Sequence, residues 1–155
     1  TRLTIPGTRP VFEHDSVGKY KDVLKHYFGW DGIRKDPVIR SALHYMKTLD
    51  MELNDGPFKD FQKFVDATPE DSVIFTYVRE PDEITRMVES HGAISVLVHR
   101  GSVDLQAFSN PADEEVESIR YQHYILNIGN HDDLRREAYK FVNDNLLNGL
   151  KTTKK

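Results

Sequence analysis

The chain has 155 residues, of which 38% are hydrophobic and 30% charged, and its formal net charge is −4. This length has room for one domain with a buried core, and the composition is that of a folded globular protein rather than a disordered or collagen-like one. The sequence contains no cysteine, which excludes disulfides, a thiol nucleophile and cysteine-ligated metal sites. The acidic balance argues against a polymeric nucleic acid as partner, and no apolar run reaches the ~18 residues of a membrane span. We therefore expect a single cytoplasmic domain over residues 1–155.

The first half of the chain predicts a short strand followed by three helices. Residues 11–13 form the strand, and Asp15 and Ser16 then offer helix caps before an apolar stripe that ends at Gly29. The pair Asp36-Pro37 predicts the start of a second, longer helix. The run Asn54-Asp55-Gly56-Pro57 separates that helix from a third, which is rich in phenylalanine.

The second half predicts strands that alternate with helices. Residues 72–78 and 93–98 are β-branched and nearly continuously apolar, as in strands of a parallel sheet that is covered on both faces. The helix expected between them, over residues 80–90, gives the length of a right-handed parallel crossover. A lid-like polar loop follows over residues 101–122, and then come a strand over 123–127, a helix over 130–147 and a frayed tail over 151–155. The fold class is α/β.

Charged and polar residues follow each predicted parallel strand, at the edge where open α/β sheets bind ligands. Arg79 follows the first of these strands, Arg100 the second, and Asn127 with Gly129 the third. Two arginines at neighbouring strand ends match the oxygens of a phosphate. The alternative is that Arg79 pairs with Glu83 and that Arg100 lies in solvent.

Two other features carry weaker signals. Asn54 and Asp55 place an amide and a carboxylate at a helix start, although turn chemistry alone accounts for them. The seven histidines include no HxH or HExxH spacing, so we expect no metal site. A Walker A phosphate loop is also absent from these residues. In the nearest string, Val17-Gly18-Lys19-Tyr20, the first glycine of the motif is replaced by Glu13 and its serine or threonine by Tyr20. That string reads more simply as a first helical turn.

Several of these runs, in their order and spacing, resemble a family of proteins over roughly residues 11–148. The longest run is VREPDEI, followed by HGA and a strand ending in Arg100, and the others are GWDG, NDGPF and ILNIGN. They resemble phage and bacterial deoxynucleoside monophosphate kinase-like proteins of the P-loop class, to which dephospho-coenzyme A kinase is related. The resemblance implies a three-layer fold with a parallel sheet between helices, in which the first strand, the phosphate loop and its helix are missing or degenerate here.

The family transfers a phosphoryl group from ATP to a nucleoside monophosphate with Mg²⁺. The resemblance implies that Arg79 faces the acceptor phosphate and that Arg100 lies at the root of the lid, both as catalytic residues. It places Asn54, Asp55 and Glu83 near the acceptor nucleotide, and it places Asn127 and Gly129 near the donor base.

Without a Walker A motif, we expect these residues to bind a nucleotide or a protein partner through the acceptor face without catalysing transfer. The alternative is an active kinase whose phosphate loop lies outside the 155 residues, with Mg²⁺ and ATP as cofactors. Either way, the resemblance leaves an empty slot of ~9.5 Å between the strands over residues 72–78 and 93–98. Residues 1–10 are either an arm or a strand remnant, and in the second case residues 3–5 fill this slot. Otherwise the two strands pair directly with each other, or a strand from another molecule in a homo-oligomer fills the slot.

Overall fold

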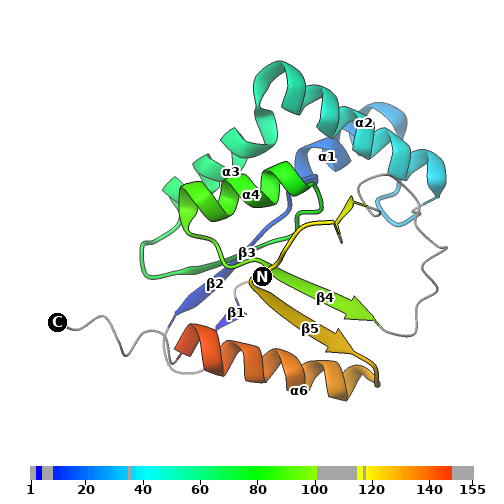
Figure 1. Ribbon diagram of the computed structural model, residues 1–155. Coiled ribbons are helices and arrows are strands. Elements are labelled where there is room, and N and C mark those ends of the chain that lie inside the picture. Colours follow the sequence, from blue (N-terminus) through cyan, green and yellow to red (C-terminus); the bar gives the residue numbers. More distant parts are fainter. Residues whose placement is uncertain (1–2, 5–8, 35, 101–114, 117, 148–155) are drawn as a thin grey trace. The chain divides into compact units, whose positions relative to one another are not determined.

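The computed structural model describes residues 3–4, 9–34, 36–100, 115–116 and 118–147 (Figure 1). The chain is an α/β protein, and it divides into two compact units, Thr1–Arg79 and Glu80–Lys155. Within the described ranges, no helix combines the length and apolarity needed to cross a membrane.

The first unit combines a small sheet with three helices. Its strands are β1 (Leu3–Thr4), β2 (Pro10–His14) and β3 (Val73–Thr76), and its helices are α1 (Gly18–Phe28), α2 (Pro37–Asn54) and α3 (Gly56–Ala67). These elements confirm the strand and three helices expected from residues 11–67. Helix α2 packs against both α1 and α3. The buried apolar side chains of this unit include those of Val11, Tyr20, Leu24, Pro57 and Phe61.

The helix boundaries follow local chemistry. Asp36 caps α2 as expected, because its Oδ1 accepts a hydrogen bond from the Ile39 amide at 3.0 Å and Pro37 fills the first turn. Gly29 ends α1 in the left-handed region with φ 65°, where glycine carries no Cβ penalty. Asp55 is the one non-glycine residue with positive φ among the residues described, and it joins α2 directly to α3.

The sheet of the first unit has the order β1-β2-β3. Strands β2 and β3 are parallel, in a register that sets Val11 beside Val73 and His14 beside Thr76. Strand β1 is antiparallel to β2, with Leu3 beside Val11. The expectation that residues 3–5 fill a slot next to the strand over 72–78 is therefore wrong, because residues 3–4 pair with the opposite edge of β2. Ile5 lies outside the described residues.

The second unit has a two-stranded parallel sheet. Its elements are α4 (Pro81–His91), β4 (Val96–Arg100), β5 (His123–Asn127), α6 (His131–Phe141) and a π-helical extension, Val142–Leu147. Helix α6 lies along β5 (Figure 1). The His123 ring of β5 meets the Phe141 ring of α6 edge-on, with the ring centroids 5.3 Å apart. Helix α4 ends at His91, one residue later than expected, and Gly92 caps it in the left-handed region with φ 61°.

Strand β4 begins three residues later than expected. Ser95 is bonded partly through side chains: its amide donates to Gln122 Oε1 at 2.8 Å, and its Oγ accepts from the Gln122 backbone amide at 3.1 Å. Its carbonyl accepts from the His123 amide at 3.0 Å. Regular pairing begins at Val96, opposite His123.

The two parallel pairs belong to different sheets, so the expected single sheet between two helical layers is not found among the described residues. Strand β3 pairs with β2 and β4 pairs with β5, so direct closure of β3 onto β4 is not seen there either. Most of the lid-like loop over 101–122 and the tail over 151–155 lie outside the described residues.

Candidate functional site

Polar side chains cluster where β2 and β3 end in the first unit. His14, the last residue of β2, directs Nδ1 to Thr76 Oγ1 at 3.1 Å, and its ring packs against Phe61 at 5.2 Å and Phe64 at 5.1 Å. Burial lowers the pKa of His14, although Asp15 and Asp60 oppose this effect. His14 is therefore a mainly neutral, packed histidine that connects β2, β3 and α3.

Ser16 and Lys47 extend this cluster. The Ser16 hydroxyl donates to the Tyr77 carbonyl at 3.0 Å, which ties the loop after β2 to the end of β3. Lys47 of α2 is only 3% exposed, and its ammonium lies 3.5 Å from Ser16 Oγ. A buried cation is thus present at the carboxyl edge of this parallel pair, where α/β proteins bind anionic ligands.

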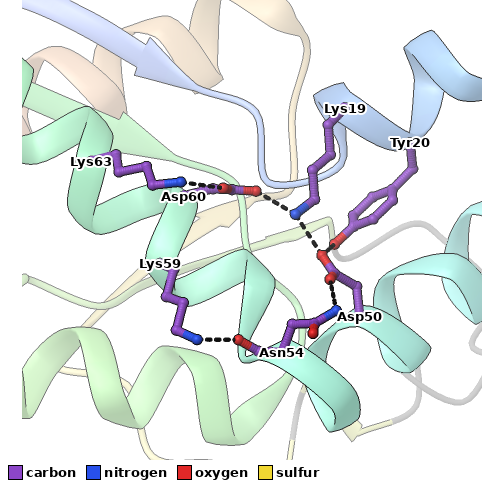
Figure 2. Close-up of polar contacts among 7 residues, drawn as sticks. All are labelled: Lys19, Tyr20, Asp50, Asn54, Lys59, Asp60 and Lys63. Carbon is purple, nitrogen blue, oxygen red and sulfur yellow. Dashed lines mark hydrogen bonds and ion pairs between the residues drawn. The ribbon is translucent and has the colours of Figure 1, made fainter.

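A second polar network joins α1, α2 and α3 (Figure 2). Its hub is Asp50 of α2, whose Oδ2 accepts from Lys19 Nζ at 2.5 Å and from the Tyr20 hydroxyl at 2.8 Å. Asp50 Oδ1 accepts from Asn54 Nδ2 at 3.0 Å. Lys19 also forms an ion pair with Asp60 of α3. One lysine therefore connects carboxylates on two different helices.

The network shifts the ionisation of its members. Hydrogen bonds from Lys19, Asn54 and Tyr20 lower the pKa of Asp50 to about 2. Burial and the bond to Asp50 raise the pKa of Tyr20. Burial acts to lower the pKa of Lys19, but its bonds to Asp50 and Asp60 outweigh burial and raise it. Lys19 is thus neutralised by two carboxylates, which suits a helix clamp better than a phosphate-binding lysine.

Gly56 is required by this network. A Cβ at position 56 would lie far inside the contact distance of the Asp50 carboxylate, 2.6 Å from Oδ1. The first residue of α3 must therefore have no side chain if Asp50 is to reach Lys19 and Tyr20.

The predicted acceptor residues Asn54 and Asp55 lie together at the junction of α2 and α3. The Asn54 side chain donates to Asp50, and the main-chain carbonyl of Asn54 accepts from Lys59 Nζ at 2.6 Å. Asp55 has φ 54° and ψ 34° and serves as the junction itself. Their contacts give both residues a structural role, and contact with a nucleotide remains a prediction.

The other predicted site residues are divided between the two units. Arg79 is exposed after β3 in the first unit, whereas Glu83 is buried on α4 in the second. Arg100 ends β4 and is the register partner of Asn127, which ends β5. Arg100 and Asn127 therefore lie side by side at the carboxyl ends of β4 and β5.

Gly129 and its neighbours form a tight turn into α6. The Gly129 amide donates to Asn127 Oδ1 at 3.3 Å. Asn130 caps α6 by accepting from the Asp132 and Asp133 amides, and Asp133 Oδ2 accepts from the Asn130 amide at 2.9 Å. These amides are therefore already bonded within the turn, and Asp132 and Asp133 place two carboxylates in the first turn of α6, as the positive end of a helix dipole favours.

Sequence reasoning did not identify Lys47, Asp50 and Asp60 as parts of a polar cluster. Their partners Ser16 and Lys19 are distant along the chain, so no local motif marks the contacts. The one usable signal was a charged residue, Lys47, on the otherwise apolar face of a predicted helix. No group of three or more histidines, aspartates or glutamates that could hold a metal ion occurs within the described ranges.

Comparison of this chain with family models, with curated proteins and with solved structures finds no match.

Proposed function

We propose that this chain is a nucleotide-binding domain of the nucleoside monophosphate kinase type, which holds a nucleoside monophosphate at the carboxyl ends of its parallel strands. The observation that carries the proposal is the register of the second unit, where Arg100 and Asn127 end adjacent parallel strands at the same level. A guanidinium matches phosphate oxygens, and an amide recognises the edge of a base. Both chemistries that a nucleotide needs are thus supplied at one edge.

The first unit supports the same proposal with its own carboxyl edge. The buried ammonium of Lys47 and the exposed Arg79 both lie near or after the ends of its parallel pair. We also propose the finer fold class that the resemblance implies, a three-layer fold of the P-loop kinase type.

For these 155 residues we propose binding without phosphoryl transfer. Kinases of this class depend on backbone amides and a lysine that hold the phosphates of the donor nucleotide. The 155 residues of the printed sequence contain no Walker A motif that would supply these groups. The alternative is an active deoxynucleoside monophosphate kinase whose phosphate loop lies outside these residues and which uses Mg²⁺ and ATP. Detectable ATP-dependent phosphorylation of a deoxynucleoside monophosphate by this chain favours the alternative.

Calorimetric titration tests the proposal with each common deoxynucleoside monophosphate and its nucleoside. We expect the monophosphate to bind at least about tenfold more tightly, since a charge-assisted hydrogen bond contributes ~1.5–3 kcal/mol. Arg100→Ala should remove most of that difference, because Arg100 ends the strand beside Asn127. Arg34→Ala is the matched control, because Arg34 is 77% exposed and pairs with Asp36 in the loop before α2. Equal affinity for nucleoside and monophosphate would show that the arginines do not bind phosphate.

A further inference from the structure

His14 is a buried titratable side chain that connects three elements of the first unit. It ends β2, its Nδ1 lies 3.1 Å from Thr76 Oγ1 of β3, and its ring packs against Phe61 and Phe64 of α3. His14 is 8% exposed and Phe61 is 4% exposed. An uncharged imidazole suits this position, because it packs on two phenyl rings without burying a charge.

The charges around His14 do not favour its protonated form. The charged groups that face it are Asp15, Asp60 of α3 and Lys47 of α2. Both carboxylates are already paired with lysines of α1. Lys47 is buried and has the same sign as an imidazolium. A proton on His14 therefore adds a second buried cation to this part of the unit.

Acid should therefore favour a state in which water reaches the His14 ring. Burial lowers the pKa of His14 below its ordinary value of 6.5, although Asp15 and Asp60 oppose this effect. A hydrated ring keeps the ordinary pKa and binds a proton more readily, so a falling pH shifts the population towards the hydrated state.

The contacts of His14 indicate which element moves. Strands β2 and β3 are held together by a parallel backbone ladder that runs from Val11 and Val73 to His14 and Thr76. Helix α3 contacts His14 through side chains. Side-chain packing on a charged ring is lost more easily than a backbone ladder, so we expect α3 to separate from His14 while the strands stay paired.

We propose that His14 is a pH-sensitive latch, whose neutral ring holds α3 against the ends of β2 and β3 and whose protonation in mild acid releases α3. The released state admits water to the carboxyl edge of this parallel pair, where the Ser16 hydroxyl donates to the Tyr77 carbonyl. This inference does not depend on nucleotide binding.

NMR of the full 155-residue chain between about pH 4.5 and about pH 7.5 tests the inference. The ring signals of His14 give its pKa. Relaxation of the Phe61 ring by a neutral, water-soluble paramagnetic probe gives the ratio of open to closed molecules. Below pH 6.5 and above the measured pKa of His14, this ratio should rise about tenfold for each unit that the pH falls, because opening takes up one proton. Helical circular dichroism should stay constant over the same range.

Two variants remove the proton-binding site and keep different parts of the packing. His14→Phe keeps a ring against Phe61 and Phe64, and His14→Gln keeps a polar group near Thr76. In each variant that folds, access of the probe to the Phe61 ring should no longer depend on pH. His26→Gln is the matched control, because His26 is exposed on α1, and it should open as the wild type does.

Three NMR results would each overturn the inference: a His14 pKa at or above 6.5, a Phe61 ring that stays inaccessible down to about pH 4.5, or wild-type opening in His14→Phe or His14→Gln. A loss of helical circular dichroism in parallel with probe access would also overturn it, because the chain would then unfold as a whole instead of opening at α3.

Discussion

The network around Asp50 makes a quantitative prediction for Asp50→Asn, which keeps the shape of the side chain and removes its charge. The pKa of Asp50 falls from 3.8 to about 2 in the folded protein. At 1.36 kcal/mol per pKa unit this shift corresponds to roughly 2.4 kcal/mol of folding free energy. Solvent screens part of that, because the side chains of Asp50 and Lys19 are 22% and 42% exposed. We therefore expect the substitution to lower the free energy of unfolding by about 1–2 kcal/mol at pH 7.

The pH dependence of this loss identifies its cause. A carboxyl whose folded pKa is depressed contributes stability that is present above its unfolded pKa and is lost as the pH falls through the folded value. The difference between wild type and Asp50→Asn should therefore be constant above about pH 5 and shrink towards zero as the pH approaches 2. Urea denaturation at a series of pH values measures it. Asp22→Asn, at an aspartate on α1 that is 80% exposed, should change stability by less than about 0.5 kcal/mol. A difference that persists unchanged at pH 2, or none at pH 7, would refute the charge-based argument.

Two further predictions concern the same unit. Gly56→Ala should lower the free energy of unfolding by about 1–3 kcal/mol, because the new Cβ collides with the Asp50 carboxylate. Urea denaturation of the double variant Gly56→Ala/Asp50→Ala should show that part of this loss is recovered. Losses that are purely additive in the double variant would contradict the collision. The pKa of His14, measured by NMR titration, should lie below 6.5 in the folded protein, so that its contribution to stability is full above pH 6.5 and is lost as the pH falls below that value. A measured pKa above 6.5 would show that Asp15 and Asp60 outweigh burial.

Local chemistry made most of the helix boundaries predictable from the sequence. Asp36-Pro37 and Gly29 act through the backbone of their own turn, so their effects are readable without the fold. The partner of residues 3–4 was not readable, because a run this short can pair with any edge. Pro6 and Gly7 stand between it and β2, and so short a connection favours antiparallel pairing with the neighbouring strand.

The candidate site was predictable only in part, because contacts between segments that are distant along the chain leave no local pattern in the sequence. The register of Arg100 with Asn127 follows from two recognisable strands and the polar residues that end them. The network of Asp50 depends on three helices meeting, and no spacing within a single helix indicates it. Lys19 was readable as part of a first helical turn, but its two carboxylate partners were not.

The junction at Asp55 has a mechanical consequence. Helix α2 ends and α3 begins at this one residue, so no loop is present to absorb a change in the angle between the two helices. An aspartate in the left-handed region has a narrow range of backbone angles, which restricts bending there. The two helices should therefore move as one rigid body, so that a displacement of α2 at Lys47 also displaces Phe61 and Phe64 on α3.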